Sequence, residues 1–270
     1  MKKKALALAS CAVLALSLLS GCGGKDTGNT LKVGASPTPH QEILEDVVKD
    51  LLAKDGITLE VVPYDDYVLP NTNVEDGQLD ANYFQHITYM NEFNESSGTH
   101  LVSVADVHYE PLGIYPGKTA SLDALADGAT VAIPNDATNG GRALLLLQQE
   151  GLIKLKDGVG MTPTVSDIAE NPRGLDIKEL KAELLTTTRQ DVDLAVINGN
   201  YALGAGLKSS DALAFEADDG AAAEAYVNVL AVKEGREDDE AIQALAKALN
   251  SPEVKSYIEE TYGGGVVALF

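Results

Sequence analysis

Residues 131–149 read VAIPNDATNGGRALLLLQQ, and the rest of the chain is organised around this stretch. A short apolar segment, 131–133, is followed by a polar Asn/Thr/Gly turn and by a leucine-rich run that ends before Gly151. The pattern predicts a strand, a turn and a helix that Gly151 caps. Because the first N–H groups of a helix lack partners within the helix, this turn is a natural place for a small anion.

Arg142 is the unusual residue of this stretch. We place it in the first turn of the predicted helix, where a cation opposes the helix macrodipole. An anion such as a carboxylate, bound between Arg142 and the helix end, would offset that cost through charge-assisted hydrogen bonds. The alternative is that Arg142 pairs with Asp136 or with another surface acid, and the residues alone leave both open.

The N-terminus predicts export. Three lysines follow Met1, an apolar run spans residues 5–19, and residues 19–22 read LSGC. This describes a secretory signal peptide, and the run is too short for a comfortable transmembrane span. LSGC resembles the bacterial lipobox, which implies cleavage before Cys22 and its acylation, with palmitate expected; an ordinary signal with an incidental cysteine is the alternative. We expect a signal at 1–21, a lipid-anchored tether at 22–30 and attachment to the extracytoplasmic face of the cell membrane.

Charge and cysteine content exclude several classes of protein. The signal holds three of the 20 basic residues and none of the 41 acidic ones, so the mature chain has a net charge of −24. Such a surface repels phosphates, and we expect no nucleic-acid partner. Cys11 lies in the signal and Cys22 would be acylated, which leaves no cysteine for a disulfide, a metal or a nucleophile.

Periodicity predicts an α/β fold. A strand at 31–35, a helix with apolar residues from 43 to 52 and a strand at 57–62 form a βαβ unit, which favours a parallel sheet. Further strands are predicted at 79–85, 130–133, 192–197, 212–215 and 227–232, and an extended pair at 100–105 and 110–115, bent near Asp106 or Pro111. A loop is predicted at 64–70, and helices at 74–77, from 86 to 93, at 121–125, around Pro163 and Pro172, and at 238–249 and 252–262.

Two α/β units joined by an extended crossing, with a late return strand, predict a two-lobed clamshell. We expect one lobe at 31–115 plus 230–270 and the other at 116–229. Open α/β sheets bind ligands at the carboxyl ends of their strands. Asn135, Asn198 and the segment 82–86 are placed in this way.

Aromatic side chains are concentrated near one predicted strand. Tyr67 precedes it, and residues 83–89 read YFQHITY, in a chain with only 5% aromatic residues. As a group they could form an aromatic slot for an apolar side chain, and a thioether would suit it. For any single one of them, an ordinary place in the core is the alternative.

Enzyme motifs are missing from the sequence. The four histidines, at 40, 86, 100 and 108, do not have metal-ligand spacing, and there is no P-loop, no Gly-x-Ser-x-Gly and no full dinucleotide fingerprint. We therefore expect no enzyme activity, no metal and no cofactor.

Several stretches together resemble the NlpA/MetQ family of methionine-binding lipoproteins. They are DYVLPN (66–71), LDANYFQH (79–86), PLGIY (111–115), VAIPND (131–136), NGGRAL (139–144), DVDLAVIN (191–198) and YVN (226–228). The resemblance implies a periplasmic-binding-protein clamshell with a mixed sheet flanked by helices in each lobe. It also implies that the protein delivers methionine to the permease and ATPase subunits of an ABC importer.

The resemblance also assigns roles to residues. Arg142 resembles the residue that binds the ligand carboxylate, and Asn198 and Asn228 match asparagines that fix the ligand's backbone polar groups. The side-chain pocket is matched by Tyr67, Phe84, His86 and Tyr89. The lobes would close by hinging near 115–117 and 229–231.

The sequence departs from the family pattern at two positions, and two alternatives to methionine delivery stay open. Thr88 and Ala225 stand where the family commonly has proline, and both lie beside predicted pocket residues. The rival ligands are D-methionine, a methionine dipeptide or another apolar amino acid. The rival class is a surface interaction protein that has lost its ligand.

Overall fold

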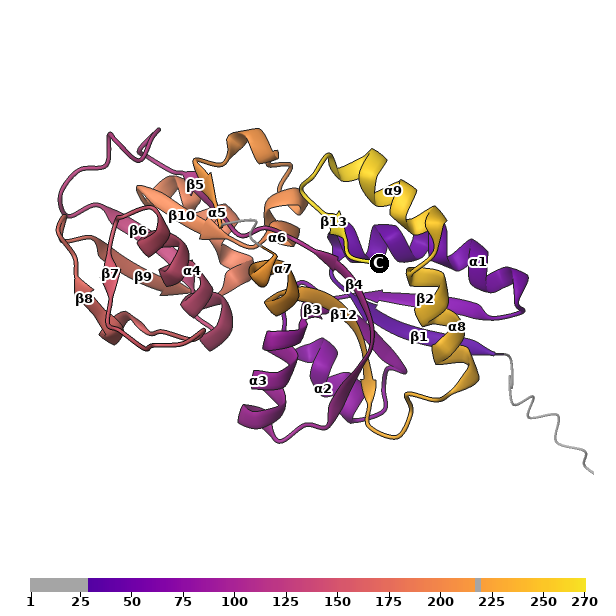
Figure 1. Ribbon diagram of the computed structural model, residues 1–270. Coiled ribbons are helices and arrows are strands. Elements are labelled where there is room, and N and C mark those ends of the chain that lie inside the picture. The colour runs from indigo at the N-terminus through magenta and orange to yellow at the C-terminus, as the bar shows by residue number, and fades with distance from the viewer. Residues whose placement is uncertain (1–28, 217–219) are drawn as a thin grey trace, which may run out of the picture.

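The computed structural model of the protein describes residues 29–216 and 220–270. Two sheets, each with its own helices, form two lobes that lie side by side (Figure 1). The predicted signal, Cys22 and most of the tether lie outside the described residues. Over the residues that are described, no helix combines the length and the apolar character that crossing a membrane requires.

The first lobe is built on a six-stranded mixed sheet of order β13-β4-β12-β3-β1-β2. β1 (Thr30–Ala35) runs parallel to β2 (Thr58–Pro63) and to β3 (Ala81–His86), which confirms the predicted parallel start. β12 (Val227–Lys233) lies antiparallel between β3 and β4 (Leu101–Tyr109), and β13 (Val267–Ala268) pairs with β4 at the edge. Segments from both ends of the chain therefore complete one sheet.

Helices cover both faces of this sheet because side chains alternate along its strands. On the first face, one core joins the sheet to η2 (Leu44–Val48), α1 (Lys49–Lys54), α8 (Glu240–Leu249) and α9 (Pro252–Tyr262). η2 and α1 come after η1 (Pro37–Gln41) in the chain. The second face packs α2 (Leu69–Glu75) and α3 (Ile87–Ser97). Within β12, Leu230 and Val232 belong to the first core, and Val229 and Ala231 to the second.

The second lobe contains a five-stranded mixed sheet with the order β11-β5-β10-β6-β9. β10 (Leu194–Ile197), β6 (Thr130–Pro134) and β9 (Asp176–Leu180) are parallel, while β5 (Gly113–Pro116) and β11 (Ala214–Phe215) are antiparallel additions. The leucines of α4 (Ala137–Gln149) pack on one face. The other face packs residues of α5 (Leu185–Thr188) and α6 (Gly199–Gly204).

Smaller elements complete this lobe and the return to the first. β7 (Lys154–Leu155) pairs with β8 (Ile168–Glu170) in a separate two-stranded sheet. Single helical turns lie at η3 (Val165–Asp167), η4 (Ala182–Leu184), η5 (Arg189–Asp191) and η6 (Ser209–Asp211), and α7 (Ala221–Ala225) precedes β12.

The chain crosses between the lobes after β4 and returns before β12. Residues 110–112 form the first crossing, at Pro111, which has no N–H to donate to a strand ladder. The predicted lobe boundaries, after residue 115 and after residue 229, fall inside β5 and β12. β5 pairs within the second sheet and β12 within the first, so the sheets change a few residues earlier than those boundaries.

Most predicted elements are present, and helix 252–262 is confirmed at both ends. Four predictions were wrong. Segments 100–105 and 110–115 do not pair, because β4 and β5 belong to different sheets. Residues 121–125 form a hydrogen-bonded turn and not a helix. Residues 151–190 contain the strands β7–β9 and not only short helices. The predicted loop at 64–70 is shorter than expected, because α2 begins at Leu69 with a proline in its first turn.

Candidate functional site

A narrow cavity lies between the two lobes. All seven predicted ligand-binding residues line it: Tyr67, Phe84, His86, Tyr89, Arg142, Asn198 and Asn228. They come from segments on both sides of the cleft and from β12, far apart in the sequence. The walls combine aromatic rings with a few buried polar groups, as small-molecule sites do.

Arg142 lies in the second turn of α4, and its placement in the first turn was wrong. The helix begins at Ala137, because the side chain of Asp136 accepts a hydrogen bond from the N–H of Asn139 and caps it. The capping residue, Asp136, lies six residues before Arg142. The helix macrodipole therefore does not explain Arg142.

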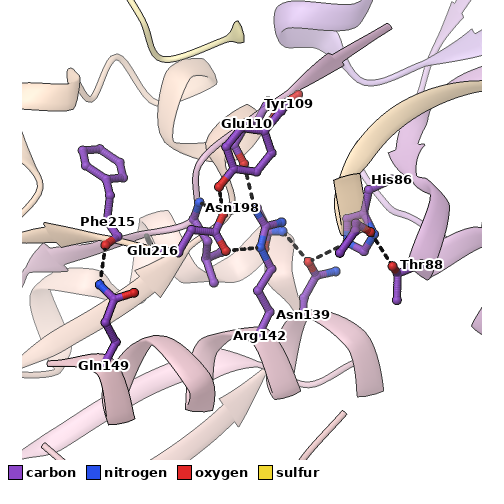
Figure 2. Close-up of polar contacts among 12 residues, drawn as sticks. His86, Thr88, Tyr109, Glu110, Asn139, Arg142, Gln149, Asn198, Phe215 and Glu216 are labelled. Atoms are coloured by element: carbon purple, nitrogen blue, oxygen red, sulfur yellow. Dashed lines mark hydrogen bonds and ion pairs between the residues drawn. The ribbon is translucent and has the colours of Figure 1, made fainter. Parts of the chain in front are cut away.

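Arg142 pairs with Glu216, a partner that the sequence did not reveal (Figure 2). Its Nε donates to one carboxylate oxygen at 2.7 Å, and its Nη2 donates to the other and, at 2.8 Å, to the backbone carbonyl of Glu110. Glu216 also accepts from the N–H of Leu112 at 2.8 Å and from the hydroxyl of Tyr109. The anion that Arg142 holds inside the protein is thus a buried glutamate rather than Asp136 or an exposed acid.

The guanidinium keeps its charge and one free edge. Burial acts to lower the pKa of Arg142, but the charge and hydrogen bonds of Glu216 together outweigh it. The pKa of Arg142 is therefore raised above its ordinary value. The guanidinium carbon lies 4.1 Å from the ring centre of Tyr226. Within residues 29–216 and 220–270 its hydrogen bonds use Nε and Nη2 only, so Nη1 is the donor left for a ligand.

A chain of hydrogen bonds orients Asn198 (Figure 2). Asp136 accepts from Nδ2 of Asn139 at 3.0 Å, and since a carboxylate can only accept here, Oδ1 of Asn139 must face the cavity. That oxygen accepts from Nδ2 of Asn198 at 2.7 Å. Oδ1 of Asn198 is therefore aimed away from Asn139, and it is buried without a partner among the described residues.

His86 joins the lobes across this chain. Its Nδ1 accepts the N–H of Tyr89 at 3.0 Å and so caps α3, which leaves the proton on Nε2. Nε2 then donates to Oδ1 of Asn139 at 3.2 Å. Burial, with a smaller effect of the charge on Arg142, lowers the pKa of His86 to about 3, so the ring is neutral as this pattern requires.

Asn228 is held from behind by His40. Nε2 of His40 lies 3.0 Å from Oδ1 of Asn228, and both side chains are buried. Burial lowers the pKa of His40 to about 4, so the neutral ring donates this hydrogen bond. With its oxygen engaged, Asn228 offers its amide N–H groups to the cavity that it lines.

The aromatic part of the cavity wall is a packed cluster. The ring of Tyr67 lies 5.8 Å from that of Phe84 and 5.7 Å from that of Tyr89, and Phe93 stacks on Tyr89 from outside. These residues form a separate apolar cluster of their own. Phe84 and Tyr89 are buried and also line the cavity, as partly buried Tyr67 does, whereas Tyr83 of the predicted group lies in the core of the first lobe.

Direct contacts close the cleft over the cavity. The hydroxyl of Tyr67 donates to Oδ1 of Asn200 at 2.6 Å, and that of Tyr201 donates to the backbone carbonyl of Asp65 at 2.6 Å. The two departures from the family pattern meet each other, because the hydroxyl of Thr88 donates to the carbonyl of Ala225. A proline at position 88 could not make that bond, so this contact is a feature of the present chain.

Five further residues line the cavity: Gln85, which lies in the predicted segment 82–86, and Glu110, Asn139, Gly199 and Asn200, which were not predicted. Asn139 and Asn200 follow the ends of β6 and β10, so the rule that ligands bind at carboxyl ends of strands could have found them. Glu110 carried no signal, because it lies at a crossing between lobes. Gln85 exchanges two amide hydrogen bonds of 2.7 Å with Asn71, which fastens β3 to α2.

Two of the histidines that lack metal-ligand spacing in the sequence lie close together in the fold. His40, His108 and Glu110 are buried with one possible metal-ligand atom each, all within 4.8 Å of one another. Nε2 of His108 lies 2.7 Å from Oε1 of Glu110. That is a hydrogen-bond distance, shorter than the separation of about 3.3 Å between two ligands of a tetrahedral zinc ion. The group is arranged as a hydrogen-bonded network.

These buried neutral histidines predict a loss of stability in mild acid. Burial lowers the pKa of His108 to about 3, in addition to His40 and His86. Below the ordinary value of 6.5 the unfolded chain binds protons that the folded chain excludes, so the stability is complete above that pH and is lost as pH falls toward 4. Burial raises the pKa of Glu110, which opposes the trend at the acid end.

We expect the free energy of unfolding in urea to fall by up to about 2 kcal/mol per buried histidine between pH 7.5 and pH 5. His86→Gln should flatten the dependence, and His100→Gln, a change at an exposed imidazole, should not. A stability that is level over this range would contradict the assignment of neutral buried rings.

The fold and the cavity define a two-lobed substrate-binding protein. The sequence profile described as NlpA lipoprotein matches residues 31–270, and the chain belongs to this family. It is 42% identical over 253 residues to the D-methionine-binding lipoprotein MetQ of Salmonella typhimurium, covering 92% of each chain.

Solved structures agree with this membership. A lipoprotein from Ruminococcus gnavus superposes with a TM-score of 0.88 at 55% identity, over 90% of this chain and 100% of that one. A nutrient binding protein from Burkholderia cenocepacia bound to methionine gives a TM-score of 0.84 at 42% identity, over 89% and 100%. The predicted family and fold are confirmed, and the family is one of substrate-binding transport proteins rather than enzymes.

Proposed function

We propose that this protein captures methionine outside the cytoplasm and delivers it to an ABC importer. The observation that carries the proposal is a single cavity with two unlike ends, an aromatic slot and a polar end containing Arg142 and Asn198. An amino acid with a long apolar side chain has the same division. Relatives and solved neighbours named for methionine binding support this choice of ligand.

The polar end matches the main-chain groups of an amino acid. The ligand carboxylate accepts from Nη1 of Arg142 and from the amide N–H groups of Asn228, which are the donors left free by Glu216 and His40. The ligand amino group donates to Oδ1 of Asn198, an acceptor that is otherwise unpaired. Binding thus satisfies buried polar groups that are incompletely satisfied without it.

The thioether lies in the aromatic slot of Tyr67, Phe84 and Tyr89. Sulfur–aromatic contacts add about 0.3–1.5 kcal/mol to the burial of the side chain. His86 closes the slot toward the polar end as a neutral ring, so no charge is placed beside the sulfur. These contacts favour methionine over a branched or shorter apolar amino acid.

Delivery requires a membrane partner and an anchor. In this proposal, acylated Cys22 holds the domain at the extracytoplasmic face of the cell membrane, and the permease receives the closed form while the ATPase drives transport. The lobes open and close about the crossing at residues 110–112 and the return before β12, where the chain passes between the sheets.

The test is calorimetric titration of the mature domain after ligand is removed by denaturation and refolding. Four ligands are compared: L-methionine, D-methionine, leucine and Gly-Met. We expect L- or D-methionine to bind with the highest affinity, since both place the thioether in the slot. Binding of Gly-Met alone would change the ligand within the importer role, and failure of all four would favour the interaction-protein alternative.

A further inference from the structure

Glu110 is a buried carboxylate in the cavity wall to which no role has been assigned. It lies at the first crossing between the lobes, with its side chain only 7% exposed, and it lines the cavity. Burying a carboxylate is costly unless its charge is paired or strongly hydrogen-bonded. The groups around Glu110 therefore show whether its carboxylate has hydrogen-bond donors and a counter-charge.

Hydrogen-bond donors fix the carboxylate in position. His108 donates from Nε2 to Oε1 at 2.7 Å, and its Nδ1 accepts from the hydroxyl of Tyr83, 2.5 Å away, so the proton of His108 faces Glu110. Burial raises the pKa of Glu110, and the backbone N–H of Asn200 acts to lower it. A Cβ at Gly199 would lie 2.7 Å from Cβ of Glu110, so only glycine permits this close packing.

None of these donors supplies a positive charge. Burial lowers the pKa of His108 to about 3 and that of His40, whose Nε2 lies 3.5 Å from Oε1, to about 4, so both rings are neutral. The one cation that lines the cavity among the described residues, Arg142, is paired with Glu216 through two nitrogens. The carboxylate of Glu110 is hydrogen-bonded but lacks a counter-charge of its own.

A second acceptor lines the same cavity. Oδ1 of Asn198 is buried and unpaired among the described residues, and Asp136, acting through Asn139, fixes its direction. Gly199, the next residue, packs against Glu110, so the two acceptors are held by adjoining positions of the chain. A carboxylate without a counter-charge and an unpaired neutral oxygen match a primary ammonium, which carries one charge and three donors.

We propose that Glu110, together with Oδ1 of Asn198, binds the ammonium group of the ligand and makes the protein selective for amino acids over their deaminated analogues. This inference rests on the proposed function, since it concerns the polar end of the same ligand. Glu216 neutralises Arg142 internally, and Glu110 remains as the charge that distinguishes a zwitterion from a simple carboxylate. The ligand class is thus defined by its amino group as well as by its thioether.

The test compares two proteins and two ligands. The wild-type protein and Glu110→Gln are each titrated with L-methionine and with 4-(methylthio)butanoate, which is methionine without its amino group. Glutamine keeps the size and most hydrogen bonds but removes the charge. We expect the wild-type preference for methionine to fall at least about tenfold in Glu110→Gln, through loss of methionine affinity alone.

If Glu110 has only a structural role, Glu110→Gln should weaken the binding of both ligands equally, and that result would overturn the inference. Glu60→Gln, at an exposed carboxylate on β2, is the matched control and should change neither affinity. Should Glu110→Gln not fold, the wild-type protein suffices, because equal affinity for the two ligands would overturn the inference. If wild type binds neither ligand, the proposed function itself fails.

Discussion

Arg142→Ala is expected to weaken methionine binding roughly 100- to 1,000-fold. The ligand carboxylate loses the donor at Nη1, and alanine provides no replacement. The same change leaves Glu216 buried without its cation, although the N–H of Leu112 and the hydroxyl of Tyr109 still donate to it. Breaking a buried pair in this way destabilises a protein by about 3–5 kcal/mol.

Two measurements separate these effects for Arg142. Urea unfolding reports the stability, and titration at a temperature well below the melting midpoint reports the affinity. Glu216→Gln removes only the internal partner, so it should reduce stability while leaving Nη1 in place for the ligand. Arg236→Ala, at a partly exposed guanidinium paired with Asp80 and Asp239, controls for loss of one positive charge. Unchanged methionine affinity in folded Arg142→Ala would contradict the carboxylate assignment.

Asn139→Leu is expected to lower methionine affinity about 100-fold and stability by about 2–4 kcal/mol. Asn139 is 1% exposed and is the common partner of three groups, Asp136, Asn198 and His86. Leucine has a similar shape but can neither accept nor donate. Nδ2 of Asn198 and Nε2 of His86 would then be buried without partners, and the bond that joins the lobes through His86 would be lost.

Calorimetry and urea unfolding also test the Asn139 prediction, with Asn91→Leu on an exposed position of α3 as the control. Asn91→Leu should leave both quantities near their wild-type values. An Asn139→Leu protein that binds methionine normally would show that the orientation of Asn198 does not depend on this chain of hydrogen bonds.

The sequence predicted the fold well where apolar periodicity was strong. The βαβ start, the strand at 192–197 and the two C-terminal helices follow from that pattern, and Gly151 caps α4 in the left-handed conformation, as expected. It failed at residues 151–190, where β7 and β8 have only two and three residues and no usable period. The pairing of β4 and β5 was also wrong, since sequence adjacency does not show that a chain leaves one sheet for another.

The sequence indicated many of the residues that line the cavity, but it did not indicate which residues they contact. All seven residues that the family resemblance assigned to the ligand line the cavity, whereas Asn82, Tyr83 and Asn135, expected at the same edge, do not. The reason first given for Arg142 was wrong, because Asp136 starts the helix earlier. Its real partner, Glu216, is 74 residues away, and no local pattern could pair them. The network of Glu110, His40 and His108 was missed because it forms only when β4 and the segment after β1 pack together, whereas Asn139 could have been found from its place after β6.

The most direct test of methionine binding is the L-methionine arm of the wild-type titration. We expect one methionine per chain, bound at the polar end by Arg142, Asn198 and Asn228 with its thioether against the aromatic rings. Stoichiometric binding that leucine cannot match would support this arrangement. Absence of methionine binding by folded, ligand-free protein would contradict it.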